Sequence, residues 1–531
     1  MASLATVLGS GAMTNSIDDA TKADAFLILG ANITEAHPVI GAKIKKALRA
    51  GAKLVVVDPR KTEIACLADV HLQLRPGTDV ALLNALLKVI IDEDLLDRAY
   101  IDAHTENFLT VREAVSRYTA EYAAAITGVP PEEIRKAARM YGEAGCGAIF
   151  YTMGITQHRS GTDNVKCIAN LALATGNLGR PGTGINPLRG QNNVQGACDM
   201  GALPDVLPGY QPVETKRARF EQLWATRLPD KPGLTVGEMF AGDLKAMYIV
   251  GENPVLSDPD SNQVQQALRN LDFLVVQDIF LTETAKLADV VLPAASFAEK
   301  EGTFVNTERR VQKVNKAISA IGESRADWEI VTALAKKMGQ DWGYVSSEQI
   351  FVEIARAVPA FAGLSYGRLE KQGLQWPCPD AEHPGTPILH RDGPIRGKGI
   401  FSAVDYTGAA ESPDSQYPFI LTTGRILFHY HTGTMSRKAK GLKTHRSRER
   451  LEINALDAEK LCLSDGDQVR VISRRGRIEA EVQLTDRVPP GVIFMTFHFR
   501  ESAANILTNT EADPISKTPE LKVSAVRLEK I

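Results

Sequence analysis

The stretch LVVVDPRKTEIACLADVHL, from Leu54 to Leu72, decides the fold because a second copy of it, LVVQDIFLTETAKLADVVL, runs from Leu274 to Leu292. In both copies a short apolar run ends at an aspartate, Asp58 or Asp278, and T-E-x-A and A-D-V follow at the same distances. The segments upstream are also alike, FLILGANITEAHP and MYIVGENPVLSDP. Self-similarity of this kind predicts one α/β module used twice.

The residues around the first copy alternate short apolar runs with helical patterns, which is typical of parallel α/β units. We expect buried strands at residues 25–29 and 53–57, an amphipathic helix at 39–50, and a further strand at 148–153. Ligands of such sheets bind beyond the carboxyl ends of the strands, where glycine turns admit phosphates. Two copies therefore suggest two nucleotide-like ligands, or an architectural duplication with one ligand. Neither copy contains G-x-G-x-x-G, which argues against NAD.

The length of 531 residues suggests several domains. We expect an α/β domain at residues 1–190, a second related α/β domain at 191–315, a connecting segment at 316–410 with a Pro- and Gly-rich linker at 375–399, and a C-terminal β-barrel-like domain at 411–531. Period-two alternation on both sides of Arg474-Arg475-Gly476 predicts a hairpin in that last domain.

Composition excludes several classes of protein. The formal charge of -3 indicates no nucleic-acid footprint, and no run of eighteen apolar residues predicts a membrane span. The basic run RKAKGLKTHRSRER at 437–450 is expected to be a solvated surface loop or a docking patch for an acidic partner or phosphate. Six cysteines without a C-x-x-C pair encode no local zinc or cubane site and suit a reducing cytoplasm, and the first residues are not a signal peptide.

The segment from Leu171 to Pro204 becomes rich in Gly, Asn and Gln, as expected of a long functional loop that wraps a ligand. Its motif PLRGQNNVQGACDMGALP resembles the catalytic subunit of formate dehydrogenases in the molybdopterin oxidoreductase family. GANITEAHP, VVDPRK, LRPGTD, MGITQH, EGTFVNTERRVQ and DPISKTPELKVSAVRLE extend the resemblance nearly end to end. The resemblance implies the architecture of dimethyl sulfoxide reductase.

This resemblance also implies two molybdopterin guanine dinucleotides around one Mo or W atom. Formate would lose hydride to a metal–sulfido centre and give CO2, or the reverse. It makes Arg189 the arginine beside the metal, where a guanidinium can hold formate through two charge-assisted hydrogen bonds. A structural pairing of Arg189 with a neighbouring acid is the alternative. The implied partners are electron-transfer subunits of iron–sulfur, flavoprotein or hydrogenase type.

The resemblance further implies contacts to the pterin dinucleotides. Any one of these residues has an alternative role as a cap, a turn or a surface polar group. The residues are Gly30, Asn32, Glu35, His37, Asp58, Arg60, Gly77, Asp79, Met153, Gln157, Gln191, Asp278, Arg425, His429, Thr432, Asn505 and Lys522. We expect His158 and Cys198 to be structural.

Members of the family carry an N-terminal cysteine cluster for a [4Fe–4S] centre and then a cysteine or selenocysteine that binds the metal. Neither is found in this sequence, and we expect both upstream of Met1. A selenocysteine codon read as a stop would explain this, and the chain alone would then be inactive. Two other functions stay open: another enzyme of the family such as nitrate reductase, or a cofactor-free structural subunit like the related large subunit of respiratory complex I.

Overall fold

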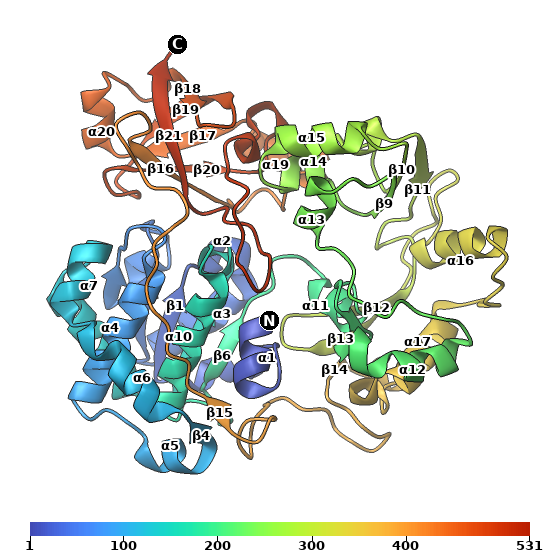
Figure 1. Cartoon of the computed structure of the whole chain (residues 1–531), viewed down its shortest axis with the longest axis horizontal. Coiled ribbons are helices and arrows are strands. Elements are labelled where there is room, and N and C mark those ends of the chain that lie inside the picture. Colours follow the sequence, from blue (N-terminus) through green and yellow to red (C-terminus); the bar gives the residue numbers. More distant parts are fainter. The chain divides into compact units, whose positions relative to one another are not determined.

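The computed structural model describes residues 1–531, whose contacts divide them into two compact units (Figure 1). Unit 1 comprises Met1–Gly190, Leu256–Asn262 and Ile388–Ile531, and unit 2 comprises Gln191–Val255 and Gln263–Pro387. The division into four parts stays a prediction. Each unit is described below by itself.

Unit 1 contains a five-stranded parallel sheet with the order β3-β2-β1-β5-β6. Its strands are β1 (Ala25–Leu29), β2 (Lys53–Val57), β3 (Val70–Leu72), β5 (Gly147–Tyr151) and β6 (Gly184–Pro187). The first two have the predicted bounds. Strand β5 ends two residues earlier than predicted because Met153 already begins a short helix, α9 (Met153–Thr156).

Helices cover both faces of this sheet, as a parallel sheet requires. Helices α4 (Asp79–Asp92), α8 (Pro131–Gly142) and α10 (Gly161–Ala174) contribute to the core on one face, and α3 (Pro38–Arg49) packs on the other. The amphipathic helix predicted at 39–50 is therefore confirmed. The remaining helices are α1 (Ala2–Leu8), α2 (Ile33–Ala36), α5 (Arg98–His104), α6 (Phe108–Ala114) and α7 (Ala120–Thr127), and β4 (Thr105–Glu106) pairs with β15 (Gly399–Ile400).

The C-terminal part of unit 1 is a closed barrel with the order β16-β20-β17-β19-β18-β21. Its strands are β16 (Phe419–Gly424), β17 (Arg450–Ile453), β18 (Gln468–Ile472), β19 (Arg477–Leu484), β20 (Val492–Thr496) and β21 (Ser524–Lys530), with α20 (Ala455–Lys460) beside β17. The antiparallel pairing of β18 and β19 confirms the predicted hairpin. The basic run is not a loop throughout, because Lys440–His445 form helix α19, which buries no residue.

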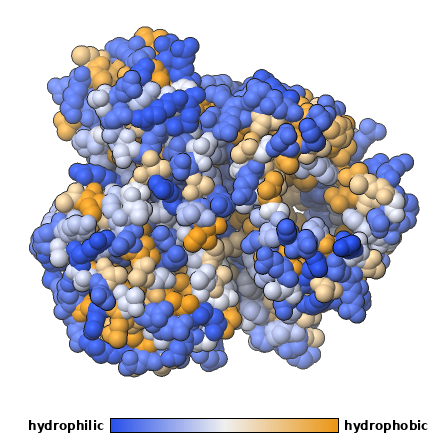
Figure 2. Space-filling view, in the orientation of Figure 1, coloured by the Kyte–Doolittle hydropathy of each residue, from blue (hydrophilic) through white to orange (hydrophobic).

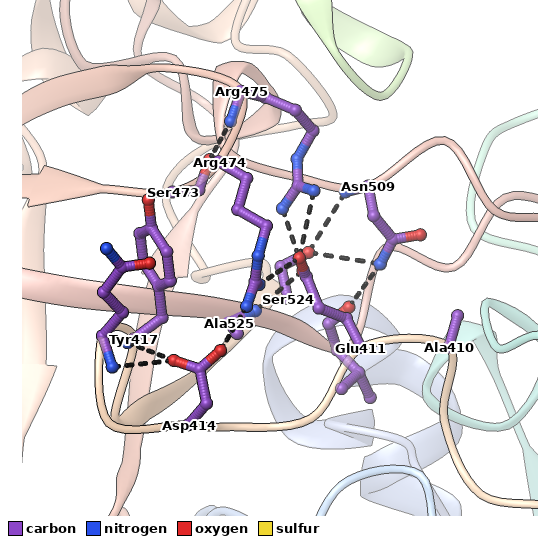
Figure 3. Close-up of polar contacts among 12 residues, drawn as sticks. Ala410, Glu411, Asp414, Tyr417, Ser473, Arg474, Arg475, Asn509, Ser524 and Ala525 are labelled. Carbon is purple, nitrogen blue, oxygen red and sulfur yellow. Dashed lines mark hydrogen bonds and ion pairs between the residues drawn. The ribbon is translucent and has the colours of Figure 1, made fainter.

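Residues 401–416, which we name the strap, lead into the barrel without forming a strand. Glu411 fixes the strap to the barrel, as Figure 3 shows. Its carboxylate accepts hydrogen bonds from Arg474 Nη1 at 2.7 Å, from Arg475 Nη2 at 2.9 Å and from the amide of Ala525 at 2.9 Å. The strap is thus tied both to the turn between β18 and β19 and to β21.

Unit 2 contains a three-stranded parallel sheet with the order β11-β10-β9, formed by β9 (Ala246–Val250), β10 (Phe273–Asp278) and β11 (Val290–Pro293). A small antiparallel sheet is formed by β12 (Gly302–Val305), β13 (Arg310–Val314) and β14 (Leu374–Gln375), and β7 (Val206–Leu207) pairs with β8 (Gln211–Pro212). The helices are α11 (Val194–Asp199), α12 (Val213–Trp224), α13 (Val236–Ala241), α16 (Asp327–Lys337), α17 (Ser347–Ala357) and α18 (Tyr366–Leu369), while α14 (Pro254–Ser257) and α15 (Ser261–Arg269) span the boundaries of the units.

The structure differs from the prediction in two segments. The Gly- and Asn-rich stretch at 171–204 is less irregular than expected, because it includes the end of α10, strand β6 and helix α11. The connecting segment at 316–410 contains α16, α17 and α18.

The internal repeat is a repeat of structure. Gly30 donates its amide to the carbonyl of Val57, and Gly251 donates its amide to the carbonyl of Gln277, in both cases at 2.8 Å. Both glycines have a positive φ, at 52° and 65°. The two modules therefore turn out of their first strand in the same way.

The surface visible in Figure 2 is largely hydrophilic, with hydrophobic residues in scattered groups. None of the helices combines the length and the apolar character needed to cross a bilayer.

Candidate cofactor and substrate site

The turns after β1 and β5 touch at the carboxyl edge of the unit 1 sheet. Gly154 donates its amide to the carbonyl of Gly30 at 3.1 Å. A Cβ on Gly30 would lie 2.6 Å from the carbonyl carbon of Gly154, and Gly30 has a φ of 52°. Only glycine fits this conformation and this close approach. The two turns are therefore held in close contact at this edge, next to the side chains that follow β1.

Those side chains carry polar atoms without partners. Asn32 Nδ2 and Glu35 Oε2 are buried and have no hydrogen-bond partner within the chain. A buried polar atom without a hydrogen-bond partner lowers the stability of a folded protein by about 1–3 kcal/mol. Burial, and then the nearby Arg425, lower the pKa of His37 to about 4, so its imidazole is neutral. The residues after β1 thus present unpaired polar atoms and a neutral imidazole.

Two carboxyl groups lie at the same edge. Asp58 follows β2 and accepts the amide of Arg60 at 2.8 Å, and burial raises the pKa of its carboxyl. Asp79 begins α4, and burial, with a smaller effect of the charge of Asp58, raises its pKa to about 7. Lys522 acts in the opposite direction on Asp58 and lowers the pKa. These three side chains are therefore close enough to influence one another's protonation.

The guanidinium of Arg60 is paired with side chains of the barrel. Its Nη2 lies 2.9 Å from both carboxylate oxygens of Glu452, and its guanidinium carbon lies 3.4 Å from the centroid of the Phe494 ring. Glu452 is on β17 and Phe494 is on β20, so both partners belong to the barrel. The guanidinium joins the sheet to the barrel.

Two cations, the buried Lys522 and the half-buried Arg425, face this edge from the barrel. Lys522 Nζ donates to the carbonyl of Thr423 at 2.7 Å, and Arg425 Nη1 donates to the carbonyl of Gly190 at 2.9 Å. Burial, together with the charge of Arg425, lowers the pKa of Lys522 to about 7. A carbonyl carries only a partial negative charge, so a buried cation bonded to it still gains from a nearby anion.

Two imidazoles of the barrel part, those of His431 and His498, lie near Arg425, and the ring of His429 lies 5.8 Å from that of His498. His429 lies with its Nε2 2.7 Å from the carbonyl of Arg446, and His498 Nε2 accepts the amide of Ile426 at 3.1 Å. Burial lowers the pKa of His431 to about 4 and that of His498 to about 3. Sequence reasoning did not select His431 and His498. The spacing His429-Tyr430-His431 was a signal for the first of them, whereas only the barrel brings in His498.

Arg189 lies two residues after the end of β6 and is half-buried. Leu188 donates its amide to the carbonyl of Tyr151 at 2.9 Å, which holds the preceding residue against the end of β5. The positive charge of Arg189 lowers the pKa of Tyr151, although burial, the larger effect, raises it. Gly190 then binds Arg425. The Arg425 guanidinium is therefore bonded to the residue that follows Arg189 in the chain.

The other predicted residues are less closely grouped. Met153 and Gln157 belong to the turn of α9, where Met153 Sδ accepts a hydrogen bond from Thr156 Oγ1 at 3.3 Å. Thr432 is buried, and its Oγ1 lies 3.0 Å from Thr434 Oγ1. A Cβ on Gly77 would lie 3.0 Å from Ala409.

Asn505 lies in the barrel part and donates its Nδ2 to the carbonyls of Leu256 and Ser257 at 2.8 and 2.9 Å, while its Oδ1 is buried without a partner. Gln191 and Asp278 belong to unit 2, where Asp278 accepts the amide of Phe280 at 3.1 Å. The other predicted residues belong to unit 1.

The two residues expected to be structural are buried. His158 Nε2 lies 2.8 Å from the carbonyl of Gly154, which explains its position. Cys198 is buried and forms no disulfide.

The unpaired polar atoms and the cations of this site suit a large polar anion. Unpaired atoms on Asn32, Glu35 and Asn505 can bind an amide-rich or hydroxyl-rich ligand, and the cations Lys522 and Arg425 can bind phosphates. No group of three or more His, Cys, Asp or Glu side chains is placed to hold a metal ion. The arrangement thus suits a cofactor that carries phosphates and many polar atoms.

Comparison with known proteins agrees with this chemistry. Residues 2–337 match the family model described as molybdopterin oxidoreductase, and residues 419–525 match the one described as molybdopterin dinucleotide binding domain. In fold, the chain is similar to acetylene hydratase from Pelobacter acetylenicus, with a TM-score of 0.76 at 20% identity over 100% of this chain and 80% of the other. The chain belongs to the molybdopterin oxidoreductase family.

Within that family, the chain is similar to formate dehydrogenases. It is 53% identical over 530 residues to the F420-dependent formate dehydrogenase subunit alpha of Methanocaldococcus jannaschii, covering 98% of this chain and 79% of the relative. It is 39% identical to formate dehydrogenase H of Escherichia coli, covering 99% of this chain and 75% of the relative.

Proposed function

We propose that the chain is the catalytic large subunit of a molybdopterin-dependent formate dehydrogenase, which interconverts formate with CO2, a proton and two electrons. The observation that carries the proposal is the position of Arg189 just beyond β6, beside Gly190, whose carbonyl accepts a hydrogen bond from Arg425 Nη1. A guanidinium binds a small carboxylate through two parallel hydrogen bonds. The identity of 53% to a formate dehydrogenase subunit alpha supports this choice of substrate.

In this proposal Arg189 binds formate and orients its C–H bond. Two molybdopterin guanine dinucleotides with Mo or W would supply the two-electron redox chemistry. Lys522 and Arg425 would bind their phosphates, and Asn32, Glu35 and Asn505 would meet their polar edges. Neutral imidazoles at His37 and His431 would keep added positive charge out of the site.

The electron acceptor in this proposal is coenzyme F420, reached through a partner subunit. The Methanocaldococcus jannaschii relative is named as F420-dependent and is more similar to this chain than formate dehydrogenase H is. The iron–sulfur cluster and the cysteine or selenocysteine ligand to the metal rest on the family resemblance. None of the six cysteines forms a disulfide, which is consistent with the cytoplasm as the proposed location.

The substitution Arg189→Lys tests the substrate. It keeps the positive charge and removes the paired hydrogen bonds, so kcat/KM for formate should fall roughly 10- to 100-fold. The measurement uses the native enzyme with benzyl viologen as acceptor, and metal and pterin contents are determined in parallel. Arg180→Lys is the matched control, because Arg180 lies in the same segment and its Nη2 donates to the carbonyl of Gly176 at 3.1 Å.

An unchanged kcat/KM for formate in Arg189→Lys would contradict the proposal. Turnover of nitrate but not formate by the native enzyme would favour the nitrate reductase alternative. A native protein with neither pterin nor metal would instead be the cofactor-free structural subunit. The buried Lys522 and the unpaired polar atoms argue against that subunit, because a scaffold gains nothing from them.

A further inference from the structure

Glu449 is a buried carboxyl within the basic run 437–450, directly before β17, and it is 2% exposed. Its Oε1 accepts the amide of Thr496 at 3.0 Å, and its Oε2 accepts a hydrogen bond from the Thr496 hydroxyl. Thr496 is the last residue of β20. The carboxyl therefore fixes the point at which the chain leaves this barrel strand.

The two residues that follow β20 hold the segment that carries Arg425. The centroid of the Phe497 ring lies 5.9 Å from the guanidinium carbon of Arg425. His498 Nε2 accepts the amide of Ile426 at 3.1 Å, and its Nδ1 is hydrogen-bonded to the carbonyl of His431. Both bonds fit one neutral tautomer of His498, with the proton on Nδ1. The segment from 425 to 431 is thus fixed by the residues next to the end of β20.

Arg425 in turn lies directly against the residue that follows Arg189. Its Nη1 donates to the carbonyl of Gly190 at 2.9 Å, and a Cβ on Gly190 would lie 2.8 Å from Arg425 Nη2. All the residues that connect Glu449 with Arg189 in this way belong to unit 1. A displacement of Thr496 would therefore reach the peptide next to Arg189.

The burial of Glu449 is unfavourable for folding. Burial raises the pKa of its carboxyl to about 7, whereas the bonds from Thr496 and the charge of Arg446 lower it. Replacing buried ionic groups by apolar residues of similar volume is often neutral or stabilising. Residues that are unfavourable for folding are expected mainly at functional sites. The bonds that Glu449 makes to Thr496 therefore explain this carboxyl better than stability does.

We propose that Glu449 is a positioning residue for formate binding, because through the end of β20 and Arg425 it sets the position of Arg189. This inference rests on the proposed function, in which Arg189 binds formate. A displaced guanidinium holds formate less well in the ground state and in the transition state alike. Such a loss raises KM and leaves kcat nearly unchanged.

Steady-state kinetics of three variants of the native enzyme test this role, with kcat expressed per bound metal atom. Glu449→Ala removes both bonds to Thr496, so KM for formate should rise roughly 5- to 10-fold while kcat changes less than about twofold. Glu449→Gln should restore the wild-type KM, because its side-chain amide can accept from the Thr496 amide and donate to the Thr496 hydroxyl.

The matched control is Asp457→Ala. Asp457 is also buried, and its Oδ2 accepts the amide of Gly491, directly before the other end of β20, at 2.5 Å. KM should be unchanged in this variant. A fall in kcat at an unchanged KM in Glu449→Ala would show only a loss of active enzyme and would overturn the proposal. An equal rise of KM in Asp457→Ala, or no rescue by Glu449→Gln, would overturn it as well.

A milder variant keeps the test decisive if Glu449→Ala does not fold. Thr496→Val removes only the hydroxyl that donates to Glu449 Oε2, and KM should rise in the same direction by a smaller factor. An unchanged KM in Thr496→Val would then overturn the proposal.

Amide hydrogen exchange of residues 425–433, measured without formate, separates this proposal from the proposed function. Exchange should be faster in Glu449→Ala than in the wild type and unchanged in Asp457→Ala. Unchanged exchange in Glu449→Ala would contradict the role of Glu449 whatever the substrate is. A wild-type enzyme that does not oxidise formate would instead contradict the proposed function.

Discussion

Lys522 illustrates what burial does to a single residue. The pKa of its ammonium lies near 7, below the ordinary value of 10.5, chiefly because of burial. Between these two values the unfolded chain binds more protons than the folded chain, so the stability of the cofactor-free chain should rise with pH. Lys522→Met should flatten this rise between pH 7 and pH 9. Urea unfolding at both pH values measures it.

The exposed Lys440 on α19 provides the control, since Lys440→Met should leave the pH dependence unchanged. An identical slope in wild type and Lys522→Met would show that the ammonium stays charged in the folded chain. In that case its partners would have to include more than the carbonyl of Thr423.

At the scale of elements, the two copies of the repeat differ in how tightly their first turn is packed. A Cβ on Gly30 would clash with Gly154 at 2.6 Å, whereas a Cβ on Gly251 would meet nothing within 4 Å. Both residues have a positive φ, so alanine costs about 1–2 kcal/mol at either position. Gly30→Ala should therefore destabilise the chain clearly more than Gly251→Ala. Chemical denaturation of both variants measures this difference. Equal losses of stability would mean that the turn at Gly154 moves to make room for the added Cβ.

The contact between the sheet and the barrel in unit 1 depends on a buried ion pair. Glu452→Gln would leave the guanidinium of Arg60 buried without its counterion, so the free energy of unfolding should fall by about 3–5 kcal/mol. The neighbouring pair of Lys61 and Asp486, at 3.4 Å, is exposed. Asp486→Asn should cost less than about 1 kcal/mol. Denaturation curves of the two variants measure the difference.

The double variant Arg60→Met, Glu452→Gln should recover part of the loss, because it removes the unpaired charge. If the double variant were less stable than Glu452→Gln, the stacking of Arg60 on Phe494 would be the larger contribution.

At the scale of the whole chain, the strap of residues 401–416 connects distant parts of unit 1, and Glu411 is its main anchor on the barrel. Glu411→Gln weakens the ionic bonds to Arg474 and Arg475. Amide hydrogen exchange should therefore speed up in the strap while the barrel strands stay protected. Mass spectrometry of peptides from the strap measures this effect.

Glu529→Gln is the matched control, because Glu529 forms an exposed pair with Arg527 at 3.1 Å. Exchange in the strap that is unchanged in Glu411→Gln would assign its anchoring to other contacts. The amide of Ala410, which donates to Glu520 at 3.1 Å, would be the first of these to consider.

Much of the fold could be predicted from the sequence. The bounds of β1 and β2, the helix between them and the hairpin of β18 and β19 follow from apolar periodicity, because each is a local pattern. Helices α16 to α18 were missed in a segment read as a connection. The basic helix α19 was read as a loop because it buries no residue and so shows no apolar stripe.

The candidate site was predictable only in part. The residues after β1 and β2 could be selected because ligands bind at the carboxyl ends of parallel strands. The sequence could not show that the guanidinium of Arg60 is hydrogen-bonded to Glu452, which lies almost four hundred positions away. Nor could it show that His498 of the barrel lies beside Arg425, since that proximity depends on the packing of the barrel.

The sequence by itself determined the two α/β modules, the C-terminal barrel and the family, because periodicity and motifs are properties of neighbouring residues. Only the tertiary structure decided which side chains are buried together, which of their polar atoms lack partners, and which part of the barrel holds Arg425. These depend on contacts between segments far apart in the chain. Desolvation there sets the protonation of Asp79 and Lys522, and no local pattern encodes it.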